Sequence, residues 1–473
     1  MNFILKLFLF IFLISSSQAF SRAGGGGGKS SSSSSSSSSS HSSSSSSHHS
    51  SGSVKQAPKW VVVIVIGIII SFVLFLIIGI AKSVIFSKKH PGISEHTSVK
   101  KNQSPVITNE FTKANTGFSK EDFKLKAKTA FMAIQKAWEE KDLSNVRNWI
   151  SDGVYQRFCL QFDMMNQLGQ KNLLSKISIN KIEFIKASIE GSYSIITVSI
   201  DFRMNDRFIS EKLPDLNEEY IAEDAIEYWT FIKKSGAIDK NLYTTNSCPN
   251  CGDELNKDGG EVSKCPSCST ITYLGDYDWV LSEITQEEDY EDDLDYDAND
   301  KGLTPLRNDE DFCIQTMEDK AANAFIHYLF ASAWNKADCF NRFGTDEVMK
   351  ELKKEIDEPY IYNRIYINRV TFSECTLADQ IYHMNFTVVY TAQRVRLVNN
   401  KVKKLDDDME MQFGDITLSR KAQKANTKSK LWSYECSNCG APYDDSISTT
   451  CNYCHNKINT AEHDWIVTSI CKA

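Results

Sequence analysis

Eight of the thirteen cysteines in this chain form two quartets whose spacing suits metal binding. In each quartet, two residues separate the cysteines of a pair, and a glycine follows the first pair. Such a turn can aim both sulfurs at one atom, and two turns supply the four thiolates of a closed zinc shell. The glycine suits the left-handed backbone of the turn. The quartets are Cys248, Cys251, Cys265 and Cys268, and Cys436, Cys439, Cys451 and Cys454.

The quartets predict two structural zinc sites, because four protein ligands leave no position on the metal for a substrate. Rubredoxin-like iron uses the same ligand set, so the choice between zinc and iron stays open. Four disulfides in an exported protein are the alternative. The paired spacing and the odd total of thirteen cysteines favour metal over disulfides.

An uncharged apolar run over residues 60–81 predicts one transmembrane helix, because it is long enough to cross the hydrocarbon layer. Ahead of it, residues 1–19 have the short apolar stretch and small residues of a secretory signal peptide, with an uncleaved signal anchor as the alternative. The Gly/Ser-rich residues 20–59 offer little apolar surface to bury and predict a low-complexity spacer. Residues 82–117 are polar and predict a linker.

The order of these segments predicts a single-pass membrane protein whose C-terminal domains are cytoplasmic. A translocated signal followed by a stop-transfer helix leaves the remaining chain on the cytoplasmic side, which is reducing and keeps thiolates available for metal. The lipid bilayer is then a partner through residues 60–81. A formal net charge of −8 and a pI near 5.7 argue against a nucleic-acid partner.

An internal repeat organises the rest of the chain. Each half has a helix that ends in Ala-Trp with an aspartate four residues after the tryptophan, and each has Asp-Trp ten residues after its last quartet cysteine. The repeat predicts two tandem domains, each with an inserted zinc ribbon, joined by an acidic linker that is either a solvated spacer or a docking strip for a basic partner. The predicted ranges are 118–285 with a ribbon at 246–270, 286–311 for the linker, and 312–471 with a ribbon at 434–456.

Within each half, helical patterns precede strand patterns, which predicts an α+β fold with an antiparallel sheet. Ser119, with Asp122 three residues on, predicts the start of the first helix. Each quartet falls between the last two predicted strands, so each ribbon is expected at the tip of a hairpin. The predicted strands are 176–186, 193–203, 227–233 and 277–284 in the first half, and 362–372, 382–393, 395–403, 411–420 and 465–470 in the second.

Three motifs together resemble the Tim44-like domain, the C-terminal domain of the mitochondrial inner-membrane subunit that tethers the import motor, and its bacterial membrane-anchored relatives. They are the helix ending at Trp138, the turn at Gly169–Asn172 and the aromatic strand Glu227–Phe231. The second half has Asp415-Ile416-Thr417-Leu418 in place of that strand's aromatic residues. The resemblance implies two cone-shaped domains of the nuclear-transport-factor-like class, with helices packed on a curved sheet.

The architecture therefore predicts a membrane-anchored binding or scaffold protein, with a protein partner and without enzymatic activity. The alternative is a small-molecule-binding or enzymatic domain of the same fold. Candidate acid–base residues do not form a spaced motif and are not shared by the two halves. These residues are His327, His383, Asp201 and Glu227.

Overall fold

The computed structural model describes Ala23 and most of the chain from residue 105 onward. The ranges are 105–214, 217, 221–237, 239–255, 265–270, 275–290, 303–307, 312–356, 358–399, 401–422, 436, 438–439, 448–462 and 464–472. No helix within these ranges is both long and apolar enough to cross a membrane. The predicted signal peptide and the predicted transmembrane span 60–81 lie outside them.

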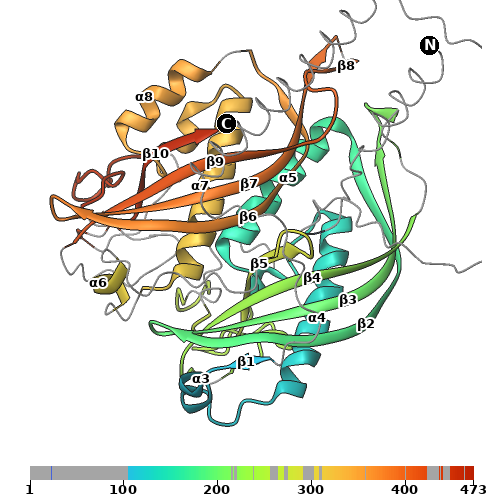
Figure 1. Cartoon of the computed structure of the whole chain (residues 1–473), viewed down its shortest axis with the longest axis vertical. Helices are drawn as coiled ribbons and strands as arrows, with labels where there is room; N and C mark the ends of the chain where they lie inside the picture. The colour runs from blue at the N-terminus through green and yellow to red at the C-terminus, as the bar shows by residue number, and fades with distance from the viewer. Residues whose placement is uncertain are drawn as a thin grey trace, which may run out of the picture. The chain divides into compact units, whose positions relative to one another are not determined.

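The first half consists of helices followed by an antiparallel sheet (Figure 1). Alternate residues of β3 (Tyr193–Ser210), from Ile196 to Met204, are completely buried, which is the period of a strand with one face on a core. The main helices are α3 (Asn109–Ala114), α4 (Lys120–Glu140) and α5 (Asp152–Leu168), with a 3-10 turn η1 (Arg147–Trp149) before α5. The strands pair in the order β2 (Gln170–Glu190), β3 (Tyr193–Ser210), β4 (Ile221–Lys234) and β5 (Val280–Gln286).

Helix α4 begins where the sequence predicts. The Ser119 hydroxyl accepts a hydrogen bond from the Asp122 amide at 3.2 Å, which satisfies one of the free amides of the first turn. The predicted apolar face is directed into the core, where the Trp138 ring lies 5.1 Å from the ring of Phe158 and 5.2 Å from that of Phe162. The helix ends at Lys141, whose φ of 54° is left-handed.

The second half repeats this order of elements. Its first helix packs against its own sheet, whose order is β6-β7-β9-β10 with the short β8 paired to β7. The helices are α7 (Ile314–Ala333) and α8 (Asp346–Glu355), separated by the 3-10 turn η3 (Ala337–Phe340). The strands are β6 (Ile361–Ala378), β7 (Ile381–Val398), β8 (Lys401–Lys404), β9 (Glu410–Lys421) and β10 (Ile466–Lys472).

The first strand of each sheet is interrupted near its start. In β2 the pairing register shifts between Ser175 and Ser178, and Lys176 between them has a φ of 53°. In β6 the register shifts between Asn363 and Ile365, around Arg364 with a φ of 56°. Such bulges bend a strand and increase its twist, so both sheets have curvature built into the strand nearest their helices. Each half is thus an α+β unit with a curved sheet.

The predicted linker 82–117 ends too late. Residues Val106–Ile107 form β1, which pairs parallel with β2, and α3 follows immediately. The Phe111 side chain on α3 is buried against the rings of Phe118 and Trp279. A polar linker was expected here because the apolar residues that pack on the core, Ile107, Phe111 and Phe118, are separated by polar residues and form no strand or helix pattern.

The predicted acidic linker 286–311 also begins inside the fold. The Asp289 carboxylate is buried and accepts a hydrogen bond from Asn368 Nδ2 at 3.0 Å. The Tyr290 ring stacks on Tyr228 at 3.7 Å. Farther on, α6 (Leu303–Arg307) contributes two buried leucines. Acidic composition alone did not reveal these partners.

The two halves belong to one compact unit that includes residues 98–473. Helix α5 of the first half lies beside α7 of the second, and both contact β5 and β6 (Figure 1). Met164 and Leu168 of α5 join the hydrophobic core of the second half. The halves are therefore packed together through α5 and α7.

Candidate metal centres

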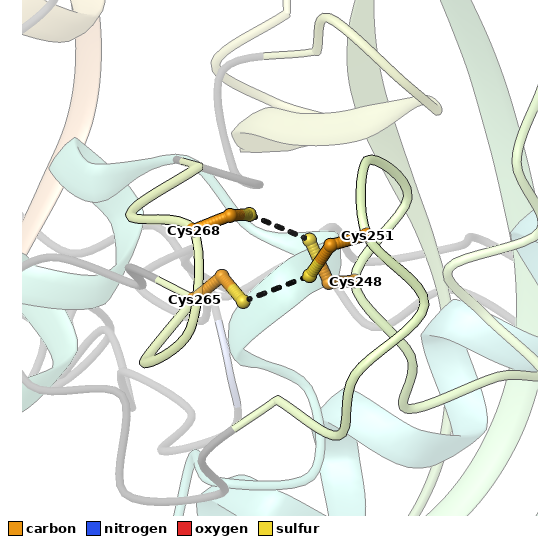
Figure 2. A group of neighbouring side chains, drawn as sticks. All are labelled: Cys248, Cys251, Cys265 and Cys268. Carbon is orange, nitrogen blue, oxygen red and sulfur yellow. Dashed lines mark hydrogen bonds between the residues drawn. The ribbon is translucent and has the colours of Figure 1, made fainter.

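The first quartet brings its four sulfurs together (Figure 2). Cys248 Sγ lies 3.6 Å from Cys268 Sγ, and Cys251 Sγ lies 3.6 Å from Cys265 Sγ. All four sulfurs lie within 4.8 Å of one another. Zinc–sulfur bonds of about 2.3 Å in a tetrahedron place the sulfurs about 3.8 Å apart, whereas a disulfide requires about 2.05 Å. The geometry fits a metal ion.

The second quartet has the same geometry. Cys436 Sγ lies 3.5 Å from Cys454 Sγ, and Cys439 Sγ lies 3.7 Å from Cys451 Sγ. All thirteen cysteines are free thiols. The sulfurs that the sequence singles out therefore lie together in each quartet, and their binding of a metal stays a prediction. Four thiolates in a tetrahedron bind zinc or iron, so the geometry is the same for both ions and metal analysis must distinguish them.

Each described knuckle turn closes with a backbone hydrogen bond to its first cysteine. The Gly252 amide donates to the Cys248 carbonyl at 2.9 Å, and Gly252 has the expected left-handed φ of 83°. The Ser269 and His455 amides make the same bond to Cys265 and Cys451, at 2.9 and 3.0 Å. Ser269 and His455 are also left-handed, with φ of 59° and 58°. The sequence predicted a left-handed residue only where a glycine follows the second cysteine, and Gly440, the second of these glycines, lies outside the described residues.

Hydrogen bonds favour the thiolate form of two of the ligands. Hydrogen bonds from Thr270 lower the pKa of Cys268 to about 6. The Asn456 backbone amide, followed by the Asn438 side chain, lowers the pKa of Cys454 to about 6. The thiolate is the form that binds metal, so these contacts favour the binding form of Cys268 and Cys454. The pKa of Cys251 is raised instead, because the hydrogen bond with the Asp253 backbone, which lowers it, is outweighed by the hydrogen bond with Cys268 and by burial.

The Asp-Trp motif anchors the first ribbon to α4. The Asp278 carboxylate forms a buried ion pair with Lys126 of α4 and accepts a hydrogen bond from the Leu242 amide at 3.0 Å. Burial raises the pKa of Asp278, and Lys126 opposes that shift. The Trp279 ring is buried, with Lys233 Nζ 5.1 Å from its centroid. The chain entering and leaving the ribbon is thus fixed to one helix.

The second half repeats this anchor. Lys320 of α7 forms an ion pair with Asp464 at 2.9 Å. The Arg420 guanidinium lies 4.9 Å from the centroid of Trp465, as Lys233 lies over Trp279 in the first half. The sequence showed the repeated Asp-Trp but not its partners. The partners could not be found from local spacing, because Lys126 and Lys320 stand at different distances from the tryptophans of their helices.

The four candidate acid–base residues have separate local partners. His327 Nδ1 lies 2.8 Å from the Asn323 carbonyl, and His383 Nδ1 lies 2.7 Å from Ser419 Oγ. The Glu227 carboxylate accepts hydrogen bonds from the Trp229 indole at 2.9 Å and from Gln286 at 3.1 Å. Asp201 accepts one from Asn180 at 2.9 Å on the exposed surface. Each of these side chains lies on a different element.

The fold and the sites define a class of protein: an α+β unit with a curved antiparallel sheet and a four-cysteine clip in its last hairpin. Residues 106–243 match the family model described as the Tim44-like domain. The match begins at β1, in agreement with the fold. It extends through β4 and ends before the first quartet and β5, and the second half shares the order of elements.

Other comparisons add little. No curated protein matches the sequence. One solved structure, described as an Ntf2-like protein involved in plasmid conjugation, aligns with 59% of this chain and 89% of its own at 11% identity, with a TM-score of 0.14. A score that low carries no argument about fold or function.

Proposed function

We propose that this protein is a membrane-anchored scaffold, which binds another protein on the cytoplasmic face through two zinc-clipped domains and has no enzymatic activity. The observation that carries the proposal is the Tim44-like domain at residues 106–243, a family whose mitochondrial member tethers an import motor to a membrane. Under this proposal the second half is a diverged copy of the first, and both are cone-shaped nuclear-transport-factor-like domains. The polar segment before β1 connects them to the helix at 60–81.

Zinc binding is supported by the sulfur distances in both quartets. The test is metal analysis of the full-length protein purified in a mild detergent. We expect about two zinc ions per chain, because each site is complete. The paired replacement of Cys248 and Cys251 by serine, and separately of Cys436 and Cys439, should each remove one ion. Protein without bound metal would refute the clip, and protein with iron would change the identity of the ion.

Membrane topology can be tested with two exposed cysteines outside the quartets, Cys339 and Cys471. In intact cells, a membrane-impermeant maleimide should leave both unlabelled, and labelling should appear after permeabilisation. The double variant Cys339→Ser/Cys471→Ser controls for labelling of the metal ligands. Labelling in intact cells would place the domains on the other side. Deletion of residues 60–81 should release the protein from carbonate-washed membranes.

The partner can be sought by cross-linking in isolated membranes. The full-length protein should be captured with another protein, and the capture should decrease in the two cysteine-pair variants if the metal supports the binding surfaces. Capture that requires neither half would refute the scaffold role of these domains. Capture lost on deletion of 60–81 alone would instead show that co-localisation is the requirement.

One observation favours the alternative of small-molecule binding. A cavity of about 510 Å³ lies between the sheet of the first half and the start of α7, and Glu190, Glu283, Thr197 and Thr230 are among the residues that line it. That volume is in the range of ligand pockets. Burial raises the pKa of both glutamates. Native mass spectrometry of the purified protein would detect a retained molecule, and only the protein mass with its metal ions would leave the scaffold as the better account.

A further inference from the structure

The two metal clips end at different places in the fold. The first ribbon leads directly into β5, which contacts both α7 and β6 of the second half. The second ribbon leads into β10, which lies at the edge of its sheet opposite to β6. The two sites are nearly identical in their own geometry, so any difference in their effect must arise from these surroundings.

The contact between the halves centres on Asp319 of α7. Its carboxylate is buried and accepts a hydrogen bond from Ser151 Oγ at 2.9 Å. Arg157 of α5 donates to the same carboxylate at 2.5 Å and to the Asp319 carbonyl at 3.2 Å. Ser151 is also the N-cap of α5, because its hydroxyl accepts from the Val154 amide at 3.1 Å. One acidic side chain of the second half is thus held at the start of a helix of the first.

Strand β5 positions both donors to Asp319. The Ser151 amide donates to the Leu281 carbonyl at 2.8 Å. Arg157 Nη2 donates to the Ser282 carbonyl at 3.3 Å. These two carbonyls belong to consecutive residues of β5. A shift of β5 therefore displaces both Ser151 and Arg157, which are the hydrogen-bond donors to the Asp319 carboxylate.

Both chain segments that flank the first ribbon hold this region. On the entering side, Trp149 Nε1 donates to the Leu242 carbonyl at 3.0 Å, and the Trp149 and Tyr243 rings stack with centroids 4.7 Å apart. On the leaving side, the Tyr243 hydroxyl donates to the Trp279 carbonyl at 2.9 Å. Trp149 lies two residues before Ser151. The segments on both sides of the first ribbon, together with β5, therefore contact the residues that precede α5 and fix their position.

The second ribbon makes the equivalent contact within its own half. The Thr345 amide donates to the Val467 carbonyl at 3.0 Å, in the position that Ser151 and Leu281 occupy in the first half. Thr345 precedes α8, whose element contacts are to α7, η3 and β10, all in the second half. The second clip therefore orders α8, and the first orders α5.

We propose that the metal in the first quartet holds the two halves of the chain together, by fixing β5 and the start of α5 around Asp319, whereas the metal in the second quartet stabilises its own half without controlling that contact. The first site is then a switch for the packing of the halves, sensitive to loss of its metal. This inference rests on the proposed binding of metal by both quartets.

The test compares matched variants of the full-length protein in detergent, Cys248→Ser/Cys251→Ser and Cys436→Ser/Cys439→Ser. Bound metal is counted, and amide hydrogen exchange is followed by mass spectrometry in peptides that cover α5, α7, α8 and β3. The first variant should exchange at least tenfold faster at the start of α5 and around Asp319. The second variant should show that change in α8 and β10 and leave α5 as in the wild type.

A third variant gives the direction of the coupling. Asp319→Asn should speed exchange at the start of α5 while the protein keeps both metal ions. In the proposal the metal fixes the contact at Asp319, and the contact is not needed to hold the metal. If the first variant loses the protection of β3 as well, its half has unfolded, and a chelator time course on the wild type replaces it: loss of protection in α5 should then coincide with release of the first ion.

The outcomes separate the inference from the proposed function. Wild-type protein without metal would remove the proposed zinc sites themselves. Loss of one ion from the first variant, with α5 and α7 exchanging as in the wild type, would overturn the coupling and leave the metal sites standing. Equal effects of both cysteine-pair variants on α5 would also overturn it, because the two sites would then act through general stability.

Discussion

Replacement of Gly153 by alanine tests the contact between the halves at one atom. Gly153 is the second residue of α5, where alanine normally stabilises a helix by about 0.5–1 kcal/mol relative to glycine. Here an added Cβ would lie 2.3 Å from Asp319 Oδ1 and 2.6 Å from Oδ2, far inside ordinary contact at 3.4–4 Å. The Asp319 side chain must therefore move by about 1 Å, away from Arg157 and Ser151.

The expected cost follows from those two effects. Overpacking of a buried site costs about 1–3 kcal/mol, and complete loss of a buried ion pair costs about 3–5 kcal/mol. After the gain in helix propensity, Gly153→Ala should lower the free energy of unfolding by about 1–3 kcal/mol. Chemical denaturation of the full-length protein in a mild detergent, followed by tryptophan fluorescence, measures this loss.

A double-mutant cycle isolates the cause. In an Asp319→Ala background the clashing carboxylate is absent, so Gly153→Ala should become neutral or stabilise the protein by up to about 1 kcal/mol. The reversal of sign is specific to the Gly153–Asp319 contact. A variant Gly153→Ala that is as stable as the wild type, or one that costs the same in both backgrounds, would refute the position of Asp319 at the start of α5.

Three further changes test other parts of the fold. Trp138→Ala should lower the free energy of unfolding by about 3–5 kcal/mol, because the ring is buried between two phenylalanines. Leu125→Ala is the control, and at a side chain that is 65% exposed it should change stability by less than about 0.5 kcal/mol. Equal losses in the two variants would contradict the burial of Trp138 in the core. Gly414→Ala should destabilise β9, since its Cβ would lie 2.4 Å from Phe325 Cζ and 2.8 Å from the Cys471 carbonyl; an unchanged melting temperature would argue against this packing. Burial lowers the pKa of His327 from 6.5 to about 4, so the unfolded chain takes up a proton that the folded one does not, and stability should fall by roughly 1 kcal/mol between pH 7 and pH 5.5. His327→Gln should lack that component, and an identical pH dependence in the two proteins would show that His327 is not the group responsible.

The convergence of the quartet sulfurs and the place of each quartet between the last two strands could be predicted because both depend on local spacing. Four cysteines in two Cys-x-x-Cys pairs need only their own turns to converge, and Ser119 needs only the amide of Asp122 to start α4. The strands were found at their centres but are longer in the structure, since buried polar residues such as Asn172 and Asp206 interrupt the apolar pattern at the ends of β2 and β3. Pairing between neighbouring strands maintains them where the pattern fades.

The packing of the halves was not predicted, because it depends on partners far apart in the sequence. Asp319 and Ser151 are 168 residues apart, and each is an ordinary polar residue of its own helix. One signal was present. In α7 nearly every residue from Ala321 to Phe330 is buried, and a helix that is apolar around most of its circumference must be covered on more than one side. Attention to that pattern would have placed a second helix against α7.

The contact between the halves uses different helices from the two repeats: α5, which follows α4 in the first half, meets α7, which corresponds to α4 in the second. It is therefore a heterologous, head-to-tail contact, which in principle can be extended by one more unit at either end. At the C-terminal end, α8 occupies the place of α5, and its outward residues Asp346, Glu347, Lys350 and Glu351 are charged and exposed. A further unit packed against α8 in this way would have to bury these charges, which disfavours extension of the contact at that helix.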